Sequence, residues 1–280
     1  MRLAVSNIAW LPEERGEVYD AMAELGVTGL EIAPRLFFSA ADDPFEPSPH
    51  VAATALAEIA DRGVMIVSMQ ALLFGASGAG LFDGEIARDN LVRAMERAIA
   101  LAGRFGIPNL VFGSPGQRRV PLGLSMDEAL DQAVSVFRGL AEMAESAGTK
   151  IAIEANPEAY GTNFLNTLDQ TVEFVTRVDH PAAVSILDLG AMQMNGDYGT
   201  VASRIPALLP KLNHVHVSEP NLAPAPKEVA ALTHVLDALR SGDYDKSVSI
   251  EMKRPSQGVA GVRASLERLV AASKGDAPHG

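Results

Sequence analysis

Cysteine is absent from this sequence of 280 residues. The chain therefore has no disulfide framework, no thiolate nucleophile and no sulfur ligand for zinc, and any metal ion would be held by oxygen and nitrogen atoms. Because thiols stay reduced in the cytoplasm and disulfides are rare there, the composition also permits a cytoplasmic location, which is the one we expect.

Positive charge is scarce as well. The chain has 23 Lys and Arg residues against 35 Asp and Glu residues, a formal net charge of −12. Such a chain would repel a phosphate backbone, so nucleic acid is not expected as a partner. Long apolar runs are also missing, because Ser6 and Asn7 interrupt the apolar first ten residues and charged residues follow at Glu13. We expect neither a signal peptide nor a membrane partner.

Aromatic residues make up only 5% of the sequence, whereas hydrophobic residues make up 48%. A core built mainly from aliphatic side chains suits buried parallel strands and packed helices. Short runs rich in Val and Ile alternate with longer stretches of helical periodicity, which indicates repeated βα units. The eight expected strands are Leu3–Ile8, Gly29–Ala33, Met65–Met69, Asn109–Gly113, Lys150–Glu154, Val184–Leu187, Asn213–Val217 and Val248–Met252.

Helical periodicity fills the segments between these runs, and several segments end in the Gly that terminates many helices. Strict alternation of eight strands and helices favours an α/β protein with one closed (β/α)₈ TIM barrel, a single domain over residues 1–280. A doubly wound open sheet is the alternative. The clearest expected helices are Glu17–Leu25, Val51–Asp61, Ile86–Arg104, Met126–Ala147, Leu168–Arg177 and Gly261–Ser273.

Residues of the metal-ligand type stand at the ends of the last four expected strands. They are Glu154, Asp188, His216 and Glu251. The C-terminal ends of all strands in a closed barrel meet on one face, where active sites of such barrels lie. Three carboxylates and an imidazole would be costly to bury there without a cation, so the pattern predicts a site for one divalent metal ion. His214 points the same way as His216 but one layer deeper, and we expect it to be a hydrogen-bonded core residue.

An oxygen-rich ligand set with one nitrogen suits Mn²⁺, Mg²⁺ or Co²⁺ in six-coordinate geometry, and Mn²⁺ is the first choice. Four protein ligands leave about two octahedral positions, which adjacent oxygens of a hydroxycarbonyl or enediolate would fill. The ligand count therefore suits a small molecule with two adjacent oxygens.

These residues resemble the xylose-isomerase-like TIM barrel superfamily, in its sugar phosphate isomerase/epimerase branch, over essentially the whole chain. In ketose 3-epimerases of that superfamily, Glu, Asp, His and Glu at the ends of strands five to eight bind the metal. The resemblance implies the same role for Glu154, Asp188, His216 and Glu251. It also implies that the partner is a small-molecule carbohydrate, and that Glu154 and Glu251 move protons on and off the substrate carbon. Assembly into a homo-oligomer is a further expectation by analogy.

Two positions depart from the epimerase pattern. Ala191 replaces a substrate-binding histidine three residues after Asp188, and Leu222 stands where an arginine is usual. The leading interpretation is an isomerase or epimerase that transfers protons through a metal-stabilised enediolate, with Glu154 and Glu251 as acid and base. The alternatives are a metal-dependent dehydratase or lyase acting on a keto-sugar or related polyol, and a noncatalytic carbohydrate-binding barrel.

Polar residues next to other strand ends are candidates for substrate contacts. They are Gln70, Asn156, Glu219 and Asn221; Glu31 is a further residue that would bind substrate hydroxyls or cap a loop. The segment 113–119, with Arg118 and Arg119, predicts either an anion contact or a solvated loop, and Lys253 and Arg254 are rival anion contacts.

Overall fold

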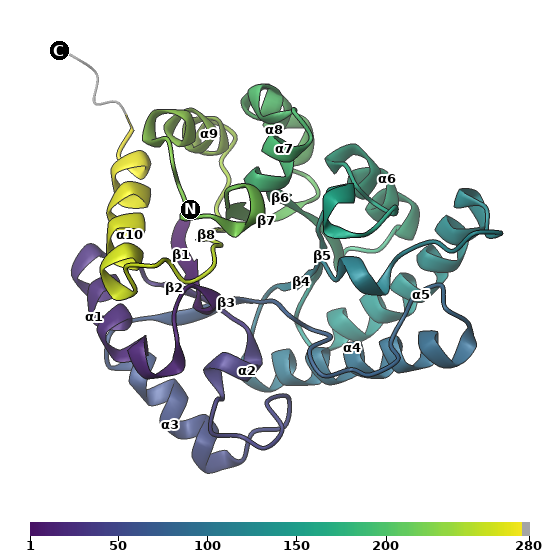
Figure 1. Ribbon diagram of the computed structural model, residues 1–280, viewed down its shortest axis with the longest axis horizontal. Helices are drawn as coiled ribbons and strands as arrows, with labels where there is room; N and C mark the ends of the chain where they lie inside the picture. The colour runs from purple at the N-terminus through teal and green to yellow at the C-terminus, as the bar shows by residue number, and fades with distance from the viewer. Residues whose placement is uncertain (276–280) are drawn as a thin grey trace. The chain divides into compact units, whose positions relative to one another are not determined.

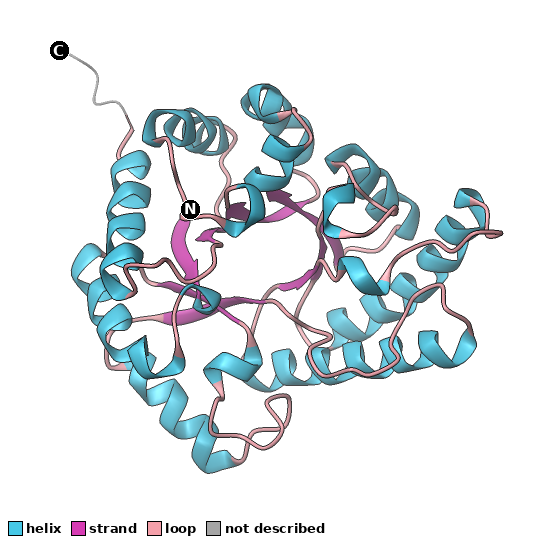
Figure 2. Cartoon of the chain, viewed as in Figure 1, coloured by secondary structure: helices cyan, strands magenta, loops and turns pink. Residues whose placement is uncertain are grey.

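The computed structural model describes residues 1–275; residues 276–280, the end of the expected domain, lie outside the described residues. Figure 2 shows strands and helices along the chain. The strands are β1 (Arg2–Ser6), β2 (Gly29–Ile32), β3 (Met65–Met69), β4 (Leu110–Phe112), β5 (Ile151–Ile153), β6 (Ala183–Asp188), β7 (Leu212–Val217) and β8 (Ser247–Ile250). The helices are α1 (Arg15–Leu25), α2 (Pro34–Phe37), α3 (Pro49–Ala60), α4 (Glu85–Phe105), α5 (Met126–Ser146), α6 (Leu168–Val178), α7 (Leu189–Met194), α8 (Val201–Leu208), α9 (Val229–Ser241) and α10 (Val259–Ser273).

The strands are hydrogen-bonded in chain order from β1 to β8, and the order closes into a barrel. This confirms the expected closed (β/α)₈ fold, and the alternative of an open sheet is wrong. The chain divides into two compact units, residues 1–67 with 188 onward, and residues 68–187. That the two form a single domain stays a prediction. Within the described part of the chain, no helix is both long enough and apolar enough to cross a membrane.

In the first unit, β1 pairs in parallel with β2 and β8, and β8 pairs in parallel with β7. The register places Ser6 opposite Glu31 and His216 opposite Ser249. Helix α10 packs between α1 and α9, and α9 also contacts α8 (Figure 1). These four strands thus share one set of covering helices, and of the expected ligands His216 lies on β7 and Glu251 directly follows β8.

Close approach of β1 and β2 depends on Gly29. A Cβ atom at this position would lie 2.7 Å from Ala4 Cβ and 2.9 Å from the Leu3 carbonyl oxygen. Real side chains do not tolerate such contacts, so a larger residue would push the strands apart. All four residues of β2 are buried, including the charged Glu31.

The first expected strand, Leu3–Ile8, is too long at its C-terminal end. The strand stops at Ser6, whose hydroxyl oxygen accepts a hydrogen bond from the Ile8 N–H and caps a 3₁₀ turn over Asn7–Ala9. A local side-chain bond of this kind competes with the strand ladder. Apolar periodicity alone did not reveal it.

In the second unit, β4 pairs in parallel with β3 and β5, and β5 pairs in parallel with β6. Helices α5 and α6 begin at capping boxes, Ser125 with Glu128 and Thr167 with Gln170, which satisfy the first free N–H groups of each helix. Phe137 on α5 packs edge-on against two other phenylalanine rings, with centroid separations of 4.8 and 5.4 Å. The few aromatic residues of the chain thus join helices to the sheet here.

Candidate active site

Three of the four expected ligands meet in the first unit. Asp188 is the last residue of β6, His216 lies on β7, and Glu251 directly follows β8. The Nδ1 atom of His216 lies 3.3 Å from Glu251 Oε2 and 3.6 Å from Asp188 Oδ2. Each residue offers a ligand atom within 4.8 Å of the others. His216 is fully buried and Glu251 is 9% exposed, so these charges are largely withdrawn from water.

The Asp188 carboxylate is held by two neighbours. Its Oδ1 atom accepts a hydrogen bond from the Ala191 N–H at the start of α7, and its Oδ2 atom accepts one from the Ser218 hydroxyl at 2.8 Å. Ser218 Oγ also accepts a hydrogen bond from the Gly190 N–H at 2.8 Å. A Cβ atom at Gly190 would lie 2.9 Å from Ser218 Oγ, so this position has no room for a side chain. Ser218 was not among the residues expected from the sequence.

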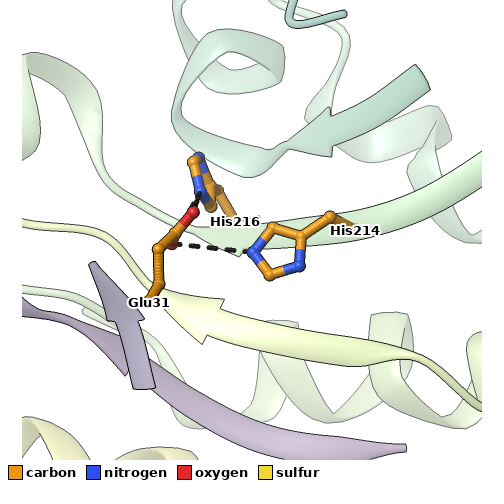
Figure 3. Close-up of side chains that lie close together, drawn as sticks. All are labelled: Glu31, His214 and His216. Atoms are coloured by element: carbon orange, nitrogen blue, oxygen red, sulfur yellow. Dashed lines mark hydrogen bonds and ion pairs between the residues drawn. The ribbon is translucent and has the colours of Figure 1, made fainter. Parts of the chain in front are cut away.

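His216 is held from the opposite side of its ring by Glu31. The Nε2 atom of His216 lies 3.0 Å from Glu31 Oε2 and 3.2 Å from Glu31 Oε1 (Figure 3). Glu31 is 0% exposed. The prediction that Glu31 binds a substrate hydroxyl or caps a loop is therefore wrong: its carboxylate is sealed in the interior against a candidate ligand.

His214 lies on the same carboxylate. Its Nε2 atom is 3.6 Å from Glu31 Oε2, and its ring stands edge-on to the His216 ring at a centroid distance of 5.2 Å. Burial by itself would raise the pKa of Glu31, but the two histidines outweigh burial and hold that pKa well below its ordinary value of 4.5. Glu31 is therefore ionised at neutral pH, and His214 is the buried residue that strand alternation predicted.

Glu154 belongs to the second unit, where it directly follows β5. Its Oε2 atom accepts a hydrogen bond from the Asn156 side-chain amide at 2.9 Å. A Cβ atom at Gly113 would lie 2.4 Å from the same oxygen, so the carboxylate occupies the space that Gly113 leaves open. Asn156, expected as a substrate contact, is 5% exposed and orients Glu154.

Arg118 is the buried charge beside Glu154. Its side chain is 0% exposed, and its Nη2 atom donates a hydrogen bond to the Glu154 carbonyl oxygen at 2.9 Å. Burial lowers the pKa of Arg118 to about 10, and the charge of Glu154 opposes that shift, so Arg118 stays protonated at neutral pH. The solvated-loop interpretation is thus wrong for Arg118, although Arg119 is exposed. Nothing in the sequence of this loop distinguishes the two arginines.

Arg254 is engaged elsewhere. It forms a bidentate ion pair with Glu14, in which its Nε atom donates to Glu14 Oε2 at 2.8 Å. The guanidinium of Arg254 is thus engaged by a carboxylate, and its expected role as an anion contact stays a prediction. Lys253 is exposed, and its backbone N–H donates to the Leu222 carbonyl oxygen.

The other expected substrate residues lie at the strand ends without a demonstrated role. Gln70 follows β3 and is 9% exposed. Glu219 Oε1 accepts a hydrogen bond from the Lys227 N–H at 2.8 Å, and Asn221 is exposed with a left-handed φ of 60°. Glu219 also lines a cavity of about 410 Å³ in the first unit, which none of the three ligands lines. Their contact with substrate stays a prediction.

Comparison with known proteins assigns the chain to a family and supports its fold. The family model described as xylose isomerase-like TIM barrel matches residues 19–272. Among curated proteins, none matches this chain.

Similar solved structures include D-psicose 3-epimerase from Clostridium cellulolyticum H10 with D-tagatose, at 18% identity and a TM-score of 0.74, covering 99% of this chain and 93% of that one. The 3-keto-D-glucoside 4-epimerase of E. coli in its apo form has 19% identity and a TM-score of 0.77, with coverage of 98% and 99%. An L-ribulose 3-epimerase has 16% identity and a TM-score of 0.76, with coverage of 98% and 94%. At these identities the likeness shows the fold alone.

Proposed function

The chain belongs to the xylose isomerase-like TIM barrel family, and from this premise we propose that it is a divalent-metal-dependent isomerase or epimerase of a sugar or sugar phosphate. The observation that carries the proposal is the position of His216 Nδ1 between the carboxylates of Asp188 and Glu251. That the neighbours named above are sugar epimerases adds support.

The donor chemistry of these residues fits a divalent cation. The two oxygens of the Glu31 carboxylate lie 3.0 and 3.2 Å from His216 Nε2, and a carboxylate accepts hydrogen bonds, so His216 Nε2 carries the hydrogen of their bond. In the neutral imidazole that would bind metal, Nδ1 is then an acceptor that faces the carboxylates of Asp188 and Glu251, and a divalent cation among them relieves the repulsion. Oxygen donors with one imidazole nitrogen suit Mn²⁺, Mg²⁺ or Co²⁺, and Mn²⁺ is our first choice.

We infer that Glu154 is the fourth ligand. Within the second unit, β5 runs parallel to β6 with Ile153 opposite Ser185. Because the two strands are parallel, Glu154 follows β5 at the same edge of the sheet at which β6 ends in Asp188. The general convergence of strand ends in a closed barrel points the same way.

Glu154 and Glu251 are the proposed acid and base. One carboxylate takes the proton from the substrate carbon beside the carbonyl, and the other returns a proton to the resulting enediolate. Asn156 holds Glu154 Oε2 and thereby fixes the orientation of that carboxylate. When bound, the divalent ion supplies fixed positive charge to the substrate oxygens, without which a sugar C–H is a very weak acid.

Turnover in D₂O tests this proposal, after a screen of ketoses, aldoses and their phosphates has identified a substrate. The product should be an isomer of the substrate that carries deuterium on the carbon beside the carbonyl. Metal removal by a chelator should abolish turnover, and Mn²⁺ should restore it.

Each of the other outcomes would indicate a different activity. A product lighter by one water would favour a dehydratase. This is the second candidate, because Ala191 and Leu222 depart from the epimerase pattern. An isomer free of carbon-bound deuterium would indicate a hydride shift. Sugar binding without turnover would leave a noncatalytic barrel. A cytoplasmic location and a homo-oligomeric state stay predictions from the sequence.

A further inference from the structure

Glu31 is a buried acid that the proposed chemistry does not use. It lies on β2, is 0% exposed, and has both His214 and His216 within reach of its carboxylate (Figure 3). Burial of a carboxylate is costly without compensating contacts, so a residue of this kind persists only where it has partners.

The contact between Glu31 and His216 involves only one of the two ring nitrogens of the histidine. Two carboxylate oxygens of Glu31 lie 3.0 and 3.2 Å from His216 Nε2, whereas the candidate ligands Asp188 and Glu251 face His216 Nδ1. A rotation of the ring by half a turn would place a carbon atom against Glu31 and forfeit a hydrogen bond to a charged acceptor. The two nitrogens of His216 therefore have different partners and cannot exchange without loss.

We propose that Glu31 is a positioning residue, which accepts a hydrogen bond from His216 Nε2–H and thereby presents Nδ1 to a divalent cation beside Asp188 and Glu251. The inference rests on the proposed function, since it requires that His216 binds metal. Carboxylates that orient ligand histidines in this way raise metal affinity by about 10- to 100-fold in other sites. Glu31 would thus act through His216 without touching the substrate.

The ring of His214 packs against this arrangement and helps to hold it. It extends from the same face of β7, because residues two apart in a strand point the same way. Its ring stands at 84° to that of His216 and is 1% exposed. The His214 ring therefore occupies space next to His216 and restricts the movement of both the carboxylate and the ligand ring.

Three variants of Glu31 separate positioning from packing. Glu31→Leu keeps most of the volume but removes the acceptor, Glu31→Ala removes both, and Glu31→Gln keeps an oxygen acceptor without the charge. Ser249→Ala is the matched control, because Ser249 is fully buried opposite His216 in the register and its hydroxyl has no hydrogen-bond partner within the described residues.

The first readout is the Mn²⁺ dissociation constant, measured from the electron paramagnetic resonance signal of the free ion. We expect binding to weaken by about 10- to 100-fold in Glu31→Leu and Glu31→Ala. Glu31→Gln should fall between these variants and the wild type, and Ser249→Ala should match the wild type. A folded Glu31→Leu protein that binds Mn²⁺ within about twofold of the wild type would overturn the proposal.

The second readout is the ¹H–¹⁵N NMR signal of His216 Nε2–H in the metal-free protein. It should be protected from exchange in the wild type and in Glu31→Gln, and lost in Glu31→Leu. If neither Glu31→Leu nor Glu31→Ala folds, a freely exchanging signal in Glu31→Gln together with wild-type Mn²⁺ affinity overturns the inference. If the wild type binds no divalent ion, the proposed function fails, and the imidazole signal alone decides whether Glu31 fixes His216.

Discussion

Glu154 and Glu251 each follow the last residue of a strand, yet their carboxylates have different neighbours. The Oε2 atom of Glu154 accepts from the Asn156 amide, whereas Oε2 of Glu251 lies 3.3 Å from His216 Nδ1. One carboxylate is thus oriented by a neutral donor and the other lies against the imidazole. We expect both carboxylates to be needed for turnover. Variants that lack either one should still fold.

Replacement of Glu154 or Glu251 by Gln should lower kcat by about 10²- to 10⁴-fold, because an amide fills the same space but cannot accept a proton at neutral pH. Steady-state kinetics on an identified substrate measures the loss, and circular dichroism checks that each variant is folded. Activity within about tenfold of the wild type in both variants would remove them from the role of acid and base.

Gly113 offers a test of how closely Glu154 is packed. In Gly113→Ala, the new methyl group would meet Glu154 Oε2 at 2.4 Å and displace the carboxylate. Because backbone φ at Gly113 is not left-handed, the change should act through this contact and leave the fold intact. We expect Mn²⁺ affinity to fall by about tenfold, as for other changes that displace metal ligands.

Gly116→Ala in the same loop is the matched control for this change. A Cβ atom at Gly116 has no other atom within 4 Å, so this variant should bind Mn²⁺ as the wild type does. Equal affinities for the Gly113 and Gly116 variants would mean that Glu154 is not a ligand or that it moves without cost.

At the scale of elements, strand ends and the turns after them set the positions of charged groups. The 3₁₀ turn Pro12–Glu14 is joined to the segment after β8 by the Glu14–Arg254 ion pair. The hydrogen bond from Arg254, followed by that from the Leu11 N–H, lowers the pKa of Glu14 from 4.5 to about 2. This pair connects two segments that are 240 residues apart in the sequence.

The pH dependence of this contribution follows from the sign of the shift. A carboxyl group with a lowered pKa stabilises the fold above its unfolded value, here about 4.5, and loses that contribution as pH falls through about 2. Arg254→Met should therefore reduce the free energy of unfolding at neutral pH, and the reduction should shrink steadily between about pH 5 and pH 3. Urea unfolding at several pH values measures both.

Glu14→Gln and the double variant complete a thermodynamic cycle with Arg254→Met. The two single changes should not be additive at neutral pH, and they should approach additivity in acid. A loss that is the same size at pH 3 and at neutral pH would assign the effect to lost packing of the Arg254 side chain.

At the scale of the whole molecule, the acidic composition and the metal proposal are connected. The formal net charge is −12, and the four proposed ligands include three of the acidic residues. A cation that binds only the folded state adds stability by mass action. At a free Mn²⁺ concentration about 100 times Kd, we expect an added free energy of unfolding of about 2.7 kcal/mol.

Elemental analysis and thermal unfolding, with and without a chelator, measure this effect. The purified wild type should carry about one divalent ion per chain. Asp188→Asn combined with His216→Asn should carry none and should not respond to Mn²⁺, whereas Glu17→Gln, a change on the exposed face of α1, should behave as the wild type. Full metal content in the double variant would show that the site has been assigned to the wrong residues.

Local sequence determined the alternation of strands and helices, because apolar periodicity, helix caps and glycine stops lie within a few residues of the elements they define. The ligand candidates could be predicted for the same reason. Asp188, His216 and Glu251 each stand at or next to the end of their own strand, and the fold class implies that such ends meet. Even so, apolar periodicity predicted a first strand that continues beyond Ser6. The observed strand ends at Ser6, whose hydroxyl caps the turn that follows.

Only the tertiary structure decided what surrounds those ligands. Glu31 is 185 residues from His216, and Ser218 is 30 residues from Asp188, so no local pattern relates either pair. Whether Glu31 faces substrate or the barrel interior depends on strand register and on which side chains share a layer, since a shift of one residue reverses every side chain of a strand. The burial of Arg118 beside exposed Arg119 has the same origin: two adjacent, chemically identical residues are distinguished only by the chain that packs around them.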